Sequence, residues 1–181
     1  MFSQGCALIS SLWLYHQRAS PEVPFPFKTA IFICGSVPLS VVEDVGFAVP
    51  DEAWRIFEIC RQSLFAQSSS SAIVARGQDR WACPFLALAD NPNPKEEKLI
   101  FGLDFAKIPS DFLLPIPTVH IYGSKDPIFP STMQLAQFCE PRFRKLYDHG
   151  GGHEIPRRSD VSRAIAELVE WSVSSCNGAV A

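Results

Sequence analysis

The sequence predicts an α/β fold in which helices flank a parallel β-sheet. Two apolar runs, at 29–34 and 118–122, each end at a glycine, and neither alternates with polar residues as a half-exposed strand would. Segments with helical periodicity lie between and after these runs, as the crossover connections of a parallel sheet require. At 181 residues, 47% of them hydrophobic and 19% charged, the chain is expected to form one domain over residues 1–181.

The first half of the chain has one helix, one strand and a long insertion. Segment 4–18 is apolar around most of its circumference and stops before Ser20 and a proline, which predicts a buried helix. After strand 29–34, the stretch 41–115 is much longer than an ordinary crossover. We expect an insertion here, either a lid over a site or a decorative surface segment. It holds a predicted helix at 51–67, a serine patch at 68–71 that indicates a loop tip or a flexible linker, and a proline-rich tract at 91–94.

The second half completes the alternation of strands and helices. An S-x-x-Q capping box at 131–134 predicts a short helix that runs to Cys139. A weaker apolar run at 144–147 is a candidate third strand. Ser159 or Asp160 can cap a final helix. Its core-facing stripe is Val161, Ile165, Leu168 and Trp171.

Charge and cysteine usage narrow the range of partners. A net charge of -3 and a pI near 5.8 provide no basic stripe, so we expect neither nucleic acid nor a membrane as partner. The six cysteines include no C-x-x-C pair and no zinc-binding spacing, which indicates buried free thiols in a reducing, cytoplasmic setting. The apolar run 6–15 has no preceding Lys or Arg and is too short to span a bilayer, so a helix is favoured over a signal peptide.

Ser3 is the candidate nucleophile. Residues 2–5, Phe-Ser-Gln-Gly, head the first predicted helix and match the G-x-S-x-G nucleophile elbow except at its first glycine, where Met1 stands. This sharp strand-to-helix turn exposes a serine oxygen at the edge of a sheet. Short matches are common, however, and Ser3 could simply cap the helix.

Asp126 and His153 complete a candidate triad. Asp126 follows strand 118–122, where open α/β sheets present functional groups, although an Asp-Pro turn is also common in loops. His153 follows three glycines at 150–152, which let the backbone turn sharply, although the segment could also be an ordinary flexible turn. The remaining histidines lie within or at the end of predicted elements: His16, His120 and His149.

The three residues occur in the chain order Ser, Asp, His, which distinguishes α/β-hydrolases from other triad folds. A serine hydroxyl is a weak nucleophile and needs a histidine to take its proton and a carboxylate to orient that histidine. The prediction is therefore a serine esterase or thioesterase in which Ser3 attacks an acyl carbonyl. The backbone N–H of Gln4 would be one oxyanion donor. No metal or organic cofactor is implied.

Four stretches resemble the fungal serine hydrolase family, the FSH-type α/β-hydrolases that include polyketide-releasing thioesterases. These are residues 2–5, 27–35, 120–127 and 149–156. The resemblance implies an α/β-hydrolase-like parallel sheet with flanking helices and a role in secondary metabolism. It also implies a small acyl ester or thioester as substrate, the thioester being presented by an acyl-carrier domain of a polyketide synthase.

Enzymes of this family carry further strands before the elbow, and that region supplies a second oxyanion amide. With Met1 at the elbow glycine, we expect an amino-terminally truncated domain that lacks the first strands. Losing one oxyanion donor typically costs about a hundredfold to a thousandfold in turnover. The alternative is therefore a weak or inactive hydrolase-like protein that binds a ligand or partner. A third possibility, a small binding domain with a chance triad, predicts that the three side chains lie far apart.

Overall fold

A computed structural model describes residues 1–85 and 99–178 of the chain. Within these residues, a three-stranded parallel sheet in the order β1-β4-β5 forms the centre of the molecule. Its strands are β1 (Ala30–Ile33), β4 (Thr118–Tyr122) and β5 (Arg144–Asp148). The mixed α/β class with a parallel sheet is confirmed.

The strands are aligned so that their carboxyl ends meet at one edge of the sheet. Ala30 pairs with Thr118, which pairs in turn with Arg144. The first residues of the chain join the same layer, because Phe2 forms a parallel bridge with Ile33. The loops that follow Phe2, β4 and β5 therefore all leave from this edge, and they carry the three candidate catalytic residues.

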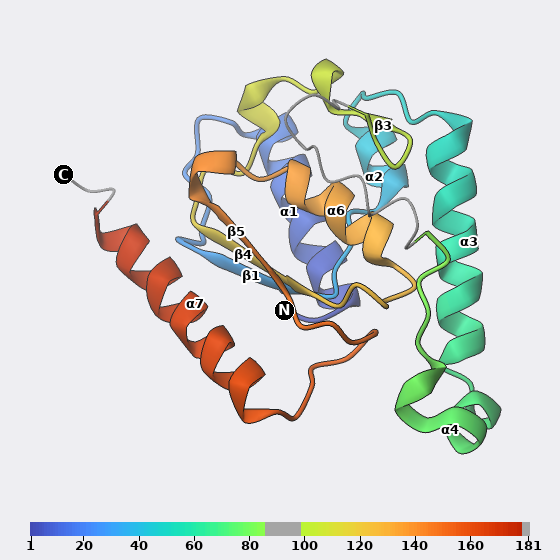
Figure 1. The fold of residues 1–181 in the computed structure, drawn as a ribbon. Helices are drawn as coiled ribbons and strands as arrows, with labels where there is room; N and C mark the ends of the chain where they lie inside the picture. The colour runs from blue at the N-terminus through green and yellow to red at the C-terminus, as the bar shows by residue number, and fades with distance from the viewer. Residues whose placement is uncertain (86–98, 179–181) are drawn as a thin grey trace.

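Helices cover both faces of the sheet (Figure 1). α1 (Gln4–Ala19) and α6 (Phe129–Gln137) lie on one face, and α7 (Ser159–Gly178) lies on the other. α3 (Asp51–Gln67) packs beside α6, on the side away from the sheet. Among the helices of the described ranges, none is long and apolar enough to cross a membrane.

α1 is buried on one face only, which corrects the expectation of an all-round buried helix. Trp13 and Leu14 face the core, and the Trp13 indole N–H donates to the Phe112 carbonyl at 2.9 Å. Leu8 is 70% exposed, and Leu12 also lies at the surface. An apolar circumference therefore did not identify the buried side, because the single sheet beneath α1 covers only one of its faces.

α6 begins earlier than the predicted capping box. The helix starts at Phe129 with Pro130 in its first turn, and Ile128 stands at the N-cap without a side-chain cap. Ser131 is a buried interior residue of the helix, so the S-x-x-Q pattern is not a cap. A proline in the first turn has no N–H to leave unpaired and already has a helical φ, which explains the earlier start.

The segment 41–115 contributes to the main core. Its described elements after α2 (Leu39–Asp44) and α3 are α4 (Ser70–Arg76), η1 (Gly77–Arg80), β2 (Leu99–Ile100), β3 (Leu103–Asp104), η2 (Phe105–Lys107) and η3 (Ser110–Phe112). Val42, Leu103 and Leu114 share one buried cluster with residues of α1 and β1. The tract 91–94, predicted to be irregular, lies outside the described residues.

Of the two alternatives for the serine patch at 68–71, the structure has a linking segment, a short junction between α3 and α4, rather than a loop tip. Ser69 caps α4, with its hydroxyl accepting a hydrogen bond from the Ala72 amide at 3.3 Å. α4 then leads through η1 to Trp81, which is buried. This arrangement brings the end of η1 close to the edge of the sheet where the loops meet.

Candidate active site

Ser3 sits at a strained turn between the bridge at Phe2 and the first residue of α1. Its φ of 49° and ψ of -117° lie in a region that L-residues seldom adopt. The turn is fixed from the neighbouring strand, because the Ser3 amide donates to the Ile33 carbonyl at 2.9 Å. Met1 is accommodated in the first elbow position, and a Cβ on Gly5 would lie 3.7 Å from the Met1 Cβ, an ordinary contact.

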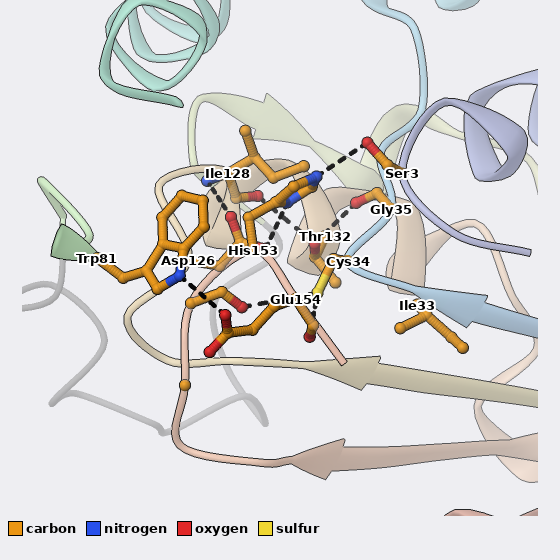
Figure 2. A network of polar contacts seen from close by, with 12 residues as sticks. Ser3, Ile33, Cys34, Gly35, Trp81, Asp126, Ile128, Thr132, His153 and Glu154 are labelled. Carbon is orange, nitrogen blue, oxygen red and sulfur yellow. Dashed lines mark hydrogen bonds and ion pairs between the residues drawn. The ribbon is translucent and has the colours of Figure 1, made fainter. Parts of the chain in front are cut away.

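Asp126 is fully buried in the loop between β4 and α6. Its Oδ1 accepts a hydrogen bond from the Ile128 amide at 2.9 Å, and its backbone N–H donates to the Gly123 carbonyl. One carboxylate oxygen is therefore occupied by the backbone of its own loop. The other, Oδ2, is directed toward His153 (Figure 2).

His153 lies between Ser3 and Asp126. Its Nδ1 is 2.9 Å from Asp126 Oδ2, and its Nε2 is 2.9 Å from the Ser3 oxygen (Figure 2). An ionised carboxylate only accepts hydrogen bonds, so Nδ1 carries the proton and Nε2 is left to accept the Ser3 hydroxyl. The histidine side chain is 10% exposed. The structure thus brings together the three residues selected from the sequence, at hydrogen-bonding distances.

Gln4 is the first residue of α1. Amides in the first turn of a helix lack intrahelical acceptors and point toward its N-terminus, where they favour negative charge. The Gln4 N–H therefore lies at the positive end of α1, immediately after Ser3.

Cys34 lies close to Asp126 and His153 of the candidate triad. It follows β1 with a φ of 46°, and its thiol is 3.7 Å from the Glu154 carbonyl and 3.9 Å from His149 Nε2. Burial raises the pKa of the Cys34 thiol well above its ordinary value, and the nearby Asp126 charge raises it further. The thiol is therefore held protonated, which makes it a poor nucleophile compared with a thiolate.

Cys34, Asp126 and His153 present ligand atoms within 4.8 Å of one another, and they are the one such trio found in the described ranges. A metal ion would need the thiolate form of Cys34 and the lone pair of His153 Nδ1. The thiol is held protonated, and Nδ1 already faces Asp126. In this state the trio offers a metal ion neither a thiolate nor a free Nδ1 lone pair.

The other buried histidines are held neutral. Burial and the charge of Arg144 lower the pKa of His120 to about 3, and burial lowers the pKa of His149. His149 Nδ1 accepts a hydrogen bond from the Gly151 amide at 3.2 Å, which fixes the tautomer with a proton on Nε2. Neither ring reaches Ser3 through a hydrogen bond that the described residues contain.

Two residues near His153 were not identified from the sequence. The Trp81 indole N–H donates to Glu154 Oε2 at 3.2 Å, and the Trp81 ring lies edge-on to the His153 ring at 6.3 Å between centroids (Figure 2). Trp81 belongs to the stretch predicted as an insertion, where no local pattern signals a distant partner. Glu154 adjoins the predicted base, and that adjacency was the only available signal.

Comparison of the sequence with known proteins identifies a family. The family model described as serine hydrolase (FSH1) matches residues 1–165. The hydrolase FUB4 of Fusarium oxysporum f. sp. lycopersici is 29% identical over 182 residues, covering 96% of this chain and 65% of the relative. The esterase FPY3 of Fusarium mangiferae is 39% identical over 177 residues, covering 95% of this chain and 56% of the relative.

A third relative is less similar in sequence but is matched over a larger share of its length. The serine hydrolase cnsH of Penicillium expansum is 22% identical over 187 residues, covering 96% of this chain and 76% of the relative. The chain thus spans 65% and 56% of the lengths of FUB4 and FPY3. No solved structure matches the chain.

Proposed function

Because the chain belongs to the FSH1 serine hydrolase family, we propose that it hydrolyses an acyl ester or thioester with Ser3 as the nucleophile. The observation that carries the proposal is the continuous hydrogen-bonded row from Ser3 through His153 to Asp126, with both distances at 2.9 Å. The three-stranded parallel sheet with flanking helices supports it, because this arrangement is consistent with a reduced α/β-hydrolase fold. We further propose that segment 41–115 is an insertion in that fold, part of which joins the core.

In the proposed reaction, the Ser3 oxygen attacks the acyl carbonyl while His153 Nε2 takes the hydroxyl proton. Asp126 holds the imidazole in the required tautomer and stabilises its positive charge. The Gln4 N–H donates to the oxyanion of the tetrahedral intermediate. His153 then returns the proton to the leaving alcohol or thiol. A water molecule, activated by the same histidine, attacks the acyl-enzyme, releases the acid and regenerates Ser3.

The surroundings of Ser3 favour an apolar acyl group. Phe2 is 42% exposed, and its ring lies 5.2 Å from the His153 ring. Ile155, just beyond His153, is 48% exposed. Exposed apolar side chains next to a reactive centre provide a contact surface for the apolar part of a substrate. We propose an acyl chain of polyketide character, delivered in the cytoplasm as a free ester or as a thioester on an acyl-carrier domain.

Active-site labelling tests whether the Ser3 oxygen is the nucleophile. The purified chain is treated with a fluorophosphonate probe, and the modified peptide is located by mass spectrometry. We expect labelling of Ser3 and hydrolysis of p-nitrophenyl and acyl-thioester substrates. Both should disappear in Ser3→Ala, since loss of a triad serine costs about 10⁶-fold in kcat.

Ser11→Ala is the matched control, because the Ser11 hydroxyl donates to the Ala7 carbonyl one helical turn away at 2.7 Å. This variant should label and turn over as the wild type does. A folded wild-type chain that neither labels nor hydrolyses any of these substrates would contradict the proposal. It would favour the alternative of a hydrolase-like binding protein.

A further inference from the structure

Trp81 packs tightly against the loop that carries His153. Trp81 is 7% exposed, and a Cβ added to Gly152 would lie 1.9 Å from Trp81 Cγ, so glycine is what allows this contact. The Arg80 guanidinium covers another part of the ring at 4.2 Å from its centroid. Trp81 is thereby fixed between its own helical segment and the histidine loop.

Glu154 joins the two segments through its carboxylate. Oε2 accepts the Trp81 indole N–H at 3.2 Å. With its amide nitrogen toward Glu154, Gln78 of η1 lies 2.9 and 2.6 Å from Oε1 and Oε2. The backbone of Glu154 is also held, because its N–H donates to the Gly152 carbonyl at 2.9 Å. The residue immediately after His153 therefore has a partner 73 positions earlier in the chain.

The histidine loop needs such an external restraint. Gly150 has a φ of 71°, and three consecutive glycines give the backbone little stiffness of its own. Asp126 fixes the imidazole only through Nδ1. The loop backbone is tied by the Lys125 amide, which donates to the Gly151 carbonyl at 3.0 Å, but this bond does not fix the His153 ring. The contact with the Trp81 ring adds a further restraint on motion of the imidazole away from Ser3.

We propose that Trp81 and Glu154 are positioning residues that hold His153 within hydrogen-bonding distance of Ser3. The effect expected on kcat rests on the proposed hydrolase function, whereas the restraint on the position of His153 is independent of that function. It assigns the η1 end of segment 41–115 to the support of the active site. A displacement of about 1 Å in a catalytic group can cost about a hundredfold in rate.

Trp81→Phe tests the proposal, because it retains an aromatic ring against Gly152 and removes the indole donor. We expect kcat to fall about tenfold to a hundredfold with KM changed less than about twofold, since the variant alters the base rather than substrate binding. Glu154→Ala should give the same loss. Glu154→Gln keeps an acceptor oxygen for the indole and should restore most of the rate.

The matched control is Trp54→Phe. The Trp54 indole donates to Glu43 Oε1 at 3.1 Å, the same bond in an exposed position on α3. Its loss should leave kcat unchanged. Equal losses in Trp54→Phe and Trp81→Phe would mean a general effect on stability and would overturn the proposal.

A chemical readout separates positioning from hydrolysis. The rate at which diethyl pyrocarbonate modifies His153, measured by peptide mass spectrometry relative to His16, should rise several-fold in Trp81→Phe and Glu154→Ala but not in Trp54→Phe. Unchanged His153 reactivity together with unchanged kcat would refute the positioning role. Altered reactivity in a chain without Ser3-dependent hydrolysis would support positioning while refuting the proposed function.

Discussion

Acid should destabilise this protein through His120. The side chain lies in the central strand, has no exposed surface and stacks on Phe32 with ring centroids 5.1 Å apart. Neither ring nitrogen has a hydrogen-bond partner in the described parts of the chain. Burial, together with the charge of Arg144, lowers the pKa of His120 from 6.5 to about 3.

The sign of the effect follows from this lowered pKa. Above pH 6.5 the ring is neutral in both the folded and the unfolded chain, and its stabilising contribution is fully present. As the pH falls from 6.5 to about 3, the unfolded chain binds a proton at His120 that the folded chain does not bind, so the free energy of unfolding falls. The slope approaches about 1.4 kcal/mol per pH unit, and the loss over the whole window is on the order of 5 kcal/mol.

His120→Phe isolates this contribution, because it keeps a ring on Phe32 and cannot be protonated. We expect the variant at pH 8 to be at least as stable as the wild type, since it removes buried nitrogens without partners, a feature that costs about 1–3 kcal/mol. Between pH 6 and 5 the wild type should lose about 1 kcal/mol more than the variant. A smaller slope should remain in the variant, because burial also lowers the pKa of His149.

Urea unfolding followed by circular dichroism at pH 8, 6 and 5 provides the measurement. The comparison at pH 8 separates packing from charge, because His120 is neutral there in both states. Parallel losses of unfolding free energy in the wild type and His120→Phe between pH 6 and 5 would refute the reasoning and show that His120 is not held neutral by the fold.

Two substitutions test the packing around the site and in the core, both by urea unfolding. Gly123→Ala would place a Cβ 2.0 Å from the Gly151 carbonyl oxygen. Because backbone atoms cannot easily move, we expect the free energy of unfolding to fall by about 3 kcal/mol. A fall below about 0.5 kcal/mol would show that the histidine loop moves freely. Leu14→Ala removes a fully buried side chain and should cost about 2–5 kcal/mol, whereas an unchanged midpoint would contradict its place in the core.

The sequence allowed prediction of the features that local pattern controls. A continuous apolar run ending in glycine marked 118–122 as a strand, and the structure has β4 there, buried along nearly its whole length. Ser3 was selected for its match to the nucleophile elbow, Asp126 because it follows a predicted strand, and His153 because three glycines precede it. Their mutual distances follow from strand order and register, which in a parallel sheet bring these loops together.

Two of the features missed from the sequence depend on contacts between distant segments. Leu8 resembles Leu14 in every local respect, yet only Leu14 is buried, because the sheet touches one face of α1. Trp81 lies in a tract without periodicity, and its partner Glu154 is 73 positions away. At Ser131, the capping pattern was outweighed by Pro130, whose fixed φ starts the helix earlier. The burial of α1 and the Trp81–Glu154 contact cannot be read from a window of neighbouring residues, whereas the start of α6 has a local signal in Pro130.

The backbone at Ser3 bears on how this chain could change over evolutionary time. A non-glycine residue held at a φ of 49° and a ψ of -117° costs about 1–3 kcal/mol that glycine would largely avoid. Selection for folding alone would therefore favour replacement of this serine by glycine within few mutational steps. A lineage that keeps a hydroxyl at this turn therefore keeps a residue that lowers the stability of the fold. A lineage in which the hydroxyl has no role should lose Ser3 before it loses the residues of the surrounding core.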